Sequence, residues 1–439
     1  MDHDGSGAAH AREQLPPVAA NPRWTGCTCV VCGRDYDTGY EGFTCADCGV
    51  DGILDAVYEH DSDAADRVRV GAGAVARGLW RFATLLPVEP AAIHAAWAVG
   101  GTAPLYAPRL AADLGLFSLV IKDDTSLPSA SLKDRAAAVA LARAHMLGLD
   151  HLACASTGNA AASLAVLASR GGFRSTIYVP AGAPRGKLAQ LLLHGARVIR
   201  VDGTYDQAFE LSLVEIAKNN WYSRNCGHNP LLVEGKKTAA LELAWDLSRG
   251  FTTSADLPDV VLVPVGDGCI VSSTAKAFLE LKTLGLVDRV PRVIGVQAAG
   301  AAALAAAWAR AGGGQASFTG PQIRAAVTPV EAATIADSIS VGIPRNRVKA
   351  WRYVAATGGA FLSVPDAAII ETIKALASRG GVFAEPSGAA GLAGALAARE
   401  AGLIGPRDRV AALVTGHGLK DPGAALGTCV MPEPVPPLR

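Results

Sequence analysis

From about residue 69 onward, short apolar runs rich in β-branched residues alternate with longer alanine-rich segments. Glycines bound many of the apolar runs, and few polar residues interrupt them. Uniformly apolar strands are typical of a parallel sheet that is covered on both faces, whereas a sheet with one face in water alternates apolar and polar residues. The pattern therefore predicts an α/β protein whose strands are each followed by a helix.

The predicted elements can be placed by residue number. The expected strands are 118–121, 152–155, 176–179, 260–265, 293–297 and 409–414. The expected helices are 134–145, 160–170, 188–194, 272–283, 366–378 and 389–400. The Ala- and Gly-rich stretch 298–314 is expected to be helical in its first half, and the chain contains no internal repeat.

Length and charge narrow the choice of partner. The 439 residues exceed the size at which a single core stops growing, which predicts two packed domains and a small appendage. The 40 basic and 40 acidic residues cancel, so a small molecule is expected as partner rather than nucleic acid or a membrane surface. No apolar run reaches the length of a bilayer span, and the first 20 residues lack the core of a signal peptide. We therefore expect a cytoplasmic protein, with residues 1–26 as a disordered leader.

The cysteines are concentrated near the N-terminus, where five of the nine lie between residues 27 and 48. Such uneven use fits a reducing compartment better than a disulfide framework. Two C-x-x-C pairs, Cys29 with Cys32 and Cys45 with Cys48, are each followed by a glycine, which is the pattern of a tetrahedral zinc ribbon. We expect a zinc-binding module over residues 27–52. Reduced surface cysteines are the alternative, and Cys27 leaves one ligand assignment open.

Three separated stretches predict a cofactor pocket. Lys133 lies where a helix is expected to begin, and an amine shielded from water there would favour Schiff-base chemistry over an ordinary solvated lysine. Residues 266–270 (G-D-G-C-I) join a strand to a helix, so their amides would hold a phosphate unless they form a plain turn. Residues 156–159 (S-T-G-N) repeat this layout and suit a carboxylate, although a helix cap would look the same.

A fourth stretch follows the last expected strand. Thr415 comes directly after that strand, and open α/β sheets place ligand contacts at the carboxyl ends of their strands. His417 lies two residues further on. A general base is one interpretation of this histidine, and a turn histidine packed beside glycines is the other.

These stretches resemble the fold type II pyridoxal-phosphate enzymes and, within them, the threonine synthase family. The motifs that carry the resemblance are S-A-S-L-K-D-R, S-T-G-N-A-A-A-S, V-P-V-G-D-G-C-I and L-V-T-G-H-G-L-K-D, in this order. Segments such as 101–105, 186–190, 234–238 and 385–390 extend it over about residues 27–422. The resemblance implies a two-domain, tryptophan synthase β-like fold and a homodimer.

The resemblance also implies domain limits. The large domain that binds pyridoxal phosphate would comprise residues 53–125 and 225–425. A small mobile domain, 126–224, would carry the asparagine loop, and 426–439 would form a tail. Substrate binding would then close the cleft between the two domains.

Roles follow for individual residues. Lys133 matches the lysine that holds the cofactor covalently and moves protons on the substrate. Asn159 matches the residue that hydrogen-bonds the pyridine 3′ oxygen, and Thr415 matches the hydroxyl that faces the ring nitrogen. The cofactor phosphate would lie on Gly266, Asp267, Gly268, Cys269 and Ile270, and the substrate carboxylate on Ser156 and Thr157.

Two departures leave the substrate open. The threonine that usually follows the loop asparagine is Ala160 here, and the arginine of an N-P-x-R segment is Leu232. Lys187, Arg224 and Lys236 are candidates to replace the lost contacts to a substrate phosphate. The reaction is therefore either O-phosphohomoserine to threonine, or a β-elimination or β-replacement of the dehydratase or cysteate synthase kind. A non-catalytic regulator that docks through the zinc ribbon is the alternative from another class.

Overall fold

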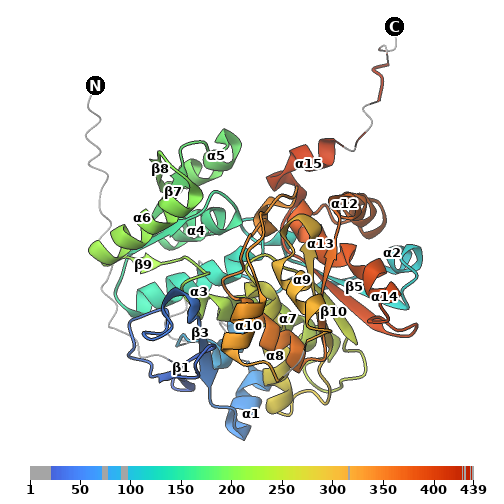
Figure 1. Cartoon of the computed structure of the whole chain (residues 1–439), viewed down its shortest axis with the longest axis horizontal. Coiled ribbons are helices and arrows are strands. Elements are labelled where there is room, and N and C mark those ends of the chain that lie inside the picture. The colour runs from blue at the N-terminus through green and yellow to red at the C-terminus, as the bar shows by residue number, and fades with distance from the viewer. Residues whose placement is uncertain are drawn as a thin grey trace.

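The computed structural model describes residues 21–71, 78–89, 97–314, 317–427, 429, 432–435 and 437. The described part of the chain forms two α/β domains and a small antiparallel sheet (Figure 1). In the large domain, all strands run parallel except the edge strand β4. In sheet order they are β12 (Ala360–Val364), β11 (Arg292–Ala298), β10 (Val260–Pro264), β13 (Arg409–Val414), β5 (Ser118–Asp123) and β4 (Pro104–Tyr106).

Successive residues of the central strand point to opposite cores, as expected for a sheet covered on both faces. Val261 and Val263 pack into the core that includes helices α7 (Leu231–Leu247) and α8 (Cys269–Thr283). Val260 and Leu262 pack into the core that includes α12 (Asp366–Gly380) and α13 (Pro386–Ala393). This double burial explains why the strands read as unbroken apolar runs.

The small domain has its own parallel sheet and core. Its strands, in order, are β8 (Arg197–Val201), β7 (Arg174–Pro180), β6 (His151–Ala155) and β9 (Tyr222–Ser223). Its helices are α3 (Lys133–Met146), α4 (Asn159–Gly171), α5 (Arg185–Leu193) and α6 (Tyr205–Lys218). In Figure 1 these elements, teal to green, form one lobe beside the yellow-to-red large domain.

The cysteine-bearing segment forms a three-stranded sheet that we call the cysteine sheet. Its order is β2 (Asp35–Tyr36), β1 (Trp24–Cys29) and β3 (Leu54–Tyr58), with antiparallel pairing. The sheet is not an independent appendage, because Trp24 and Leu54 are buried in the same core as α7 and α8. It also extends beyond the expected limits 27–52, since β3 is needed to pair with β1.

The predicted leader over residues 1–26 is wrong at its C-terminal end. Asn21 is buried, and its side-chain amide donates to the carbonyl oxygens of Ala83, Thr84 and Leu86. A buried amide with three acceptors is fixed in place. Residues 1–20 lie outside the described residues, as do 428, 430, 431, 436, 438 and 439 of the predicted tail.

The remaining helices cover the sheets and connect them. They are α1 (Ser62–Val70), α2 (Pro108–Asp113), α9 (Ala303–Arg310), α10 (Gly320–Ala326), α11 (Arg347–Ala356), α14 (Ala395–Glu400) and α15 (Pro422–Leu426). Short 3-10 turns are η1 (Gly49–Asp51), η2 (Gly78–Leu85), η5 (Asp124–Ser126), η6 (Ala299–Ala301), η7 (Asp337–Ile339) and η8 (Gly418–Lys420). None of the described helices has the length and apolar character that a bilayer span requires.

Two expectations about helices need correction. The helix predicted over 389–400 is divided into α13 and α14 at Gly394, where an added Cβ would lie 2.5 Å from a methyl of Val296. The helix expected in the first half of 298–314 begins only at Ala303. Close packing against β11 sets the first boundary.

Candidate active site

The predicted pocket residues come together in one cavity between the two domains, which we call the central cavity. Its walls come from loops at the carboxyl ends of β6, β10 and β13, together with the first turn of α3. Of the predicted residues it is lined by Lys133, Ser156, Asn159, Gly266, Asp267, Gly268, Cys269, Ile270 and Thr415. Thr157 lines an adjoining hollow instead, which shares Asn159 and Glu385 with the central cavity.

Lys133 is the first residue of α3, and the backbone just before it is fixed to the segment that follows β13. Leu132 N donates to Thr415 O at 2.9 Å, and Ser131 pairs with Gly416. Burial, followed by the nearby positive charge of Lys236, lowers the pKa of Lys133 to about 8. About a tenth of this amine is therefore uncharged at pH 7, far more than of a solvated lysine, and that fraction is able to act as a nucleophile.

The turn that leads to Lys133 holds a strained residue. Ala130 has φ 62°, a left-handed conformation that favours glycine, and its carbonyl accepts from His417 N at 3.0 Å. Left-handed backbone at a non-glycine residue costs about 1 kcal/mol or more. The hydrogen bond to the segment after β13 helps to hold the turn in this shape.

Residues 266–270, which we call the glycine loop, connect β10 to α8. Gly268 has φ 86°, and an added Cβ at Gly266 would lie 2.9 Å from Ile339 Cα, so both positions require glycine. The amides of the glycine loop donate to no acceptor in the described part of the chain. Unpartnered amides at the start of a 15-residue helix suit a phosphate.

Asn159 and Glu385 join the two domains across the central cavity. Asn159 Nδ2, at the start of α4, donates to Glu385 Oε1 at 2.7 Å. Burial raises the pKa of Glu385, while the charge of Lys133 acts in the opposite direction. Glu385 was known from the sequence only as part of a motif, and the structure adds it to the cavity wall.

Cations are numerous in the central cavity. Arg224 donates to Lys133 O at 3.2 Å and to Ser163 Oγ at 3.0 Å, and Lys236 is buried in the wall. The guanidinium of Arg345, on the large domain, lies 4.6 Å from the ring of Phe209 on the small domain. Cys226, Tyr205, Phe209, Ser338 and Arg345 were not predicted, because they lie in segments without a recognisable motif.

The two positions that depart from the family pattern, Ala160 and Leu232, lie in different surroundings. Ala160 lines the central cavity, whereas Leu232 is fully buried in the core of the small domain. Leu232 is not among the residues that line the cavity. The position that carries arginine in the family therefore contributes packing here rather than a ligand contact.

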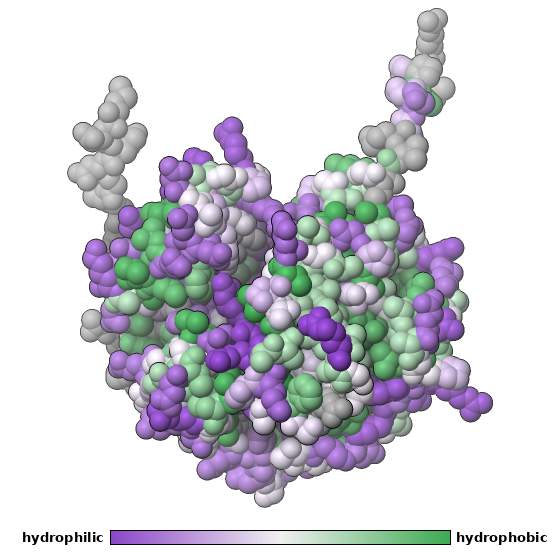
Figure 2. Space-filling model, in the orientation of Figure 1, coloured by the Kyte–Doolittle hydropathy of each residue, from purple (hydrophilic) through white to green (hydrophobic). Residues whose placement is uncertain are grey.

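The adjoining hollow opens between the two lobes, where the surface is notched (Figure 2). Lys187 of α5 pairs with Asp337 of the large domain at 2.6 Å. Lys420 Nζ, from the large domain, donates to Gln190 Oε1 of α5 at 3.3 Å. These two contacts bridge the domains at the entrance to the cavity.

His417 belongs to the turn rather than to the cavity. Its Nδ1 accepts from Leu419 N at 3.1 Å, and its ring lies edge-on to Phe383. It does not line the central cavity. These contacts favour the turn interpretation of His417 over the general-base interpretation.

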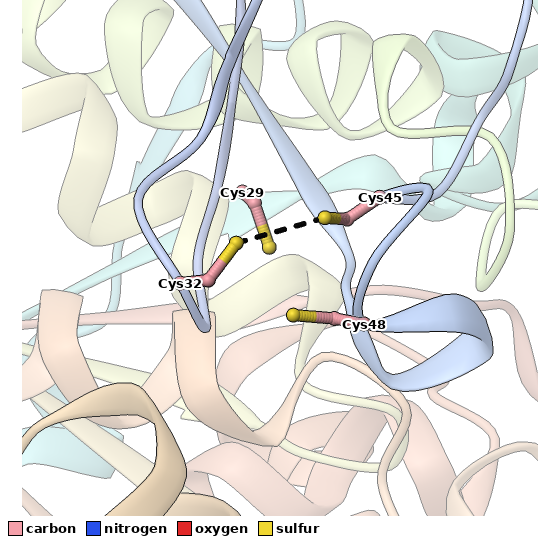
Figure 3. A group of neighbouring side chains, drawn as sticks. All are labelled: Cys29, Cys32, Cys45 and Cys48. Atoms are coloured by element: carbon pink, nitrogen blue, oxygen red, sulfur yellow. Dashed lines mark hydrogen bonds between the residues drawn. The ribbon is translucent and has the colours of Figure 1, made fainter.

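The cysteine sheet brings four thiols together. The Sγ atoms of Cys29, Cys32, Cys45 and Cys48 all lie within 4.8 Å of one another, and they come from two facing loops (Figure 3). Four thiols on two knuckles form a donor set that suits a tetrahedral soft metal ion. Cys27 is packed in the core instead, where burial raises its pKa to about 12.

One segment connects the cysteine sheet to the glycine loop. Arg347 donates to Asp51 at 2.7 Å, three residues after Cys48. The preceding residue, Asn346, donates its backbone amide to Asp267 O at 2.9 Å and its side-chain amide to Cys269 Sγ at 3.0 Å. The start of α11 thus touches both sites.

Comparisons with known proteins agree with this geometry. A family model described as "Pyridoxal-phosphate dependent enzyme" matches residues 96–416. The chain is 34% identical to a threonine synthase from Methanocaldococcus jannaschii over 91% of its length and 93% of the relative's. It is 35% identical to one from Methanosarcina acetivorans over 93% and 95%, and to one from Mycobacterium leprae over 77% and 86%.

Solved structures support the fold alone. A threonine deaminase from Solanum lycopersicum matches with a TM-score of 0.61 at 20% identity, covering 84% of this chain and 95% of its own. A diaminopropionate ammonia lyase from Escherichia coli matches with a TM-score of 0.62 at 16% identity, covering 92% and 99%.

Proposed function

The chain belongs to the pyridoxal-phosphate dependent enzyme family, and on that premise we propose that it is a lyase that converts O-phosphohomoserine to threonine. The observation that carries the proposal is the meeting of Lys133, Asn159, the glycine loop and Thr415 in one cavity. The threonine synthase relatives, which match nearly the whole chain, support the choice of reaction.

The residues present fit the cofactor. The glycine loop offers unpartnered amides to the phosphate, and Lys133 offers an amine whose pKa of about 8 suits attack on an aldehyde. Asn159 would hydrogen-bond the ring's 3′ oxygen, and the hydroxyl of Thr415 would face the ring nitrogen. When bound, pyridoxal phosphate supplies an electron sink that allows protons to leave the substrate's carbons.

The protein's own groups would then bind the substrate and move protons. Ser156 and Thr157, with the amides of their loop, would hold the substrate carboxylate. Lys133 Nζ would take protons from Cα and Cβ of the substrate and return protons to Cγ and Cα, while phosphate leaves Cγ and a water molecule supplies the hydroxyl at Cβ. Closure of the small domain over the entrance would exclude all water except the molecule that is consumed.

A phosphate-bearing substrate matches the charge of the site. Arg224 and Arg345 line the central cavity, and Lys187 and Lys420 line its entrance. Charge-assisted hydrogen bonds of this kind are the strong ones for a dianion. These cations would replace the arginine that the family carries at the position of Leu232.

The assay that tests the proposal is phosphate release from O-phosphohomoserine with threonine detected as product. Equal molar amounts of phosphate and threonine are expected. Absence of turnover with this substrate, together with ammonia release from serine or phosphoserine, would instead support the alternative, a β-elimination or β-replacement enzyme. Ala160 favours that alternative, since it leaves a small apolar contact where the family places a hydroxyl.

We propose Zn²⁺ as the ion of the cysteine sheet, with Cys29, Cys32, Cys45 and Cys48 as ligands and a structural role. One zinc per chain by metal analysis, lost in a Cys48→Ser variant, is the expected result. A homodimer, implied by the family resemblance, is expected in solution, and light scattering that gives the mass of one chain would contradict it.

A further inference from the structure

The buried lysines of this protein fall into two groups. Five lysines have little exposed surface, namely Lys122, Lys236, Lys237, Lys276 and Lys349. Four of them have a carboxylate within 3 Å, with Lys122 on Glu242 at 2.7 Å, Lys237 on Glu234 at 2.6 Å, and Lys276 and Lys349 on Asp55 at 2.8 and 2.6 Å. Lys236 pairs with no carboxylate in the described part of the chain, although only 3% of it is exposed.

The side chains that surround Lys236 also differ from those around the other four buried lysines. Its amine lies against the thiol of Cys226 and near that of Cys269, the first residue of α8. A hydrogen bond with Cys269 and the charges of Lys236 and Arg224 lower the pKa of the Cys226 thiol well below its ordinary value, so Cys226 offers Lys236 one negative partner. Lys133 and Arg224, which are also positive, lie nearby. One thiolate does not balance these cations, and uncompensated buried charge costs several kcal/mol. The site as built therefore favours a further anion.

We propose that Lys236 is the counter-ion of the cofactor phosphate. The glycine loop supplies only uncharged donors, and Lys236 adds a full positive charge beside the end of the loop at Cys269. The phosphate dianion would accept from the amides and from Lys236 Nζ together. This inference rests on the family assignment and is independent of which amino acid is the substrate.

The position of Lys236 favours the cofactor's phosphate over a phosphate on the substrate. The carboxylate loop 156–158 belongs to the small domain, and the entrance cations Lys187 and Lys420 lie beyond Asn159 and Glu385 in the adjoining hollow. Lys236 lies in the wall of the central cavity, on α7, which packs against α8. The helix that carries the lysine and the helix that begins at the glycine loop are thus direct neighbours.

The experiment compares the affinity of the apoenzyme for pyridoxal phosphate and for pyridoxal, which lacks the phosphate. In Lys236→Gln, the dissociation constant for pyridoxal phosphate is expected to rise by about 10- to 100-fold, since hydrogen bonds to charged groups are worth that much. The constant for pyridoxal is expected to stay within about threefold of wild type. Retained binding of pyridoxal also shows that the variant has folded.

Two further variants sharpen the test. Lys236→Arg keeps the charge and is expected to recover most of the preference for the phosphate. Lys187→Gln removes a lysine at the entrance and is expected to leave the ratio of the two constants unchanged. The ³¹P chemical shift of the bound cofactor gives a second readout, which should change in Lys236→Gln and not in Lys187→Gln.

Other outcomes would overturn the inference. An equal rise in both constants for Lys236→Gln would mean a general effect on the cavity. An unchanged ratio with a raised KM for O-phosphohomoserine would mean that Lys236 contacts the substrate. If neither vitamer binds the wild-type apoenzyme, the cofactor assignment itself fails, which is a separate result.

Discussion

Lys236 and Lys237 are neighbours on α7, and both are buried, yet they face opposite kinds of surroundings. Lys237 points into a cluster of ion pairs next to the cysteine sheet, which we call the network. There its amine lies 2.6 Å from a carboxylate oxygen of Glu234 and 2.8 Å from one of Glu280. Lys236 points into the central cavity among thiols and other cations. Adjacent residues on a helix differ by about 100° in direction, so one helix serves both regions.

The network balances its own charges. Lys276 reaches Asp55 of β3 at 2.8 Å and Glu234 at 2.9 Å, and Lys349 reaches Asp55 at 2.6 Å. The network thereby joins the cysteine sheet to α7, α8 and α11 without any ligand. Among the residues that line the central cavity, the cations Lys133, Arg224, Lys236 and Arg345 outnumber the carboxylates of Asp267 and Glu385. The difference indicates that the network has a structural role, whereas the cavity cations are placed for a bound anion.

The largest expected effect is the loss of turnover on replacing Lys133. A Lys133→Ala variant should turn over at least about 10³-fold more slowly than the wild type, since both the covalent link to the cofactor and the proton carrier are lost. The measurement is steady-state phosphate release, together with the visible absorption of the cofactor-loaded protein and borohydride fixation followed by peptide mass spectrometry. A variant that keeps its visible absorption or its turnover would contradict the assigned role.

The stability of two further variants tests the comparison directly. Lys237→Met should lower the free energy of unfolding by about 3–5 kcal/mol, because it removes the nearest partner of both Glu234 and Glu280 and leaves Lys276 alone to balance two buried carboxylates. Lys236→Met should change apoenzyme stability by less than about 1 kcal/mol or increase it, since it removes one of several buried cations and lets the Cys226 thiol take up a proton and become neutral. Denaturant unfolding of the two apoproteins measures both. Equal losses would show that the two lysines do not differ as argued.

The sequence predicted the parts of this protein that follow local rules. The strands at 118–121, 152–155 and 409–414 were found because doubly covered strands are uniformly apolar. The motif around Lys133 located the cavity, because a catalytic lysine needs a particular local sequence. The glycines within residues 266–270 likewise predicted a turn at that place.

Helix α7 shows why the rest was missed. It is buried on nearly all sides and includes Glu234, Lys236, Lys237 and Glu242 in its interior faces. An amphipathic pattern arises only when one face meets water, so this helix has no apolar stripe to detect. The partners of its charges lie as far away in sequence as Lys122 and Lys276. Only the folded chain shows that Lys236 pairs with no carboxylate among the described residues, whereas Lys237 pairs with two.

A smaller effect is expected where the two regions meet. Asp51→Asn weakens the contact with Arg347, and the adjacent Asn346 holds the glycine loop at Asp267. The dissociation constant for pyridoxal phosphate should rise roughly two- to fivefold, because a partly exposed ion pair contributes only about 0.2–1 kcal/mol. Fluorescence titration measures it.

Asp47→Asn provides the matched control for this contact. Asp47 also lies on the cysteine sheet's second loop, but it pairs with the exposed Arg34 at 2.8 Å. Metal content should stay at one ion per chain in both variants. A rise in the dissociation constant that is equal in both would mean that the effect does not pass through Arg347.

The smallest expected effect is a shift in pH dependence. The uncharged amine of Lys133 attacks the cofactor aldehyde, so the rate of covalent capture by the apoenzyme should rise with pH and reach half its maximum near pH 8. The charge of Lys236 disfavours protonation of Lys133. Removing it in Lys236→Gln lets the ammonium persist to higher pH, so the midpoint should move upward, by about one unit or less. Stopped-flow absorbance with pyridoxal, which lacks the phosphate, measures this midpoint, and a midpoint that stays unchanged would show that Lys236 is not charged in the apoenzyme.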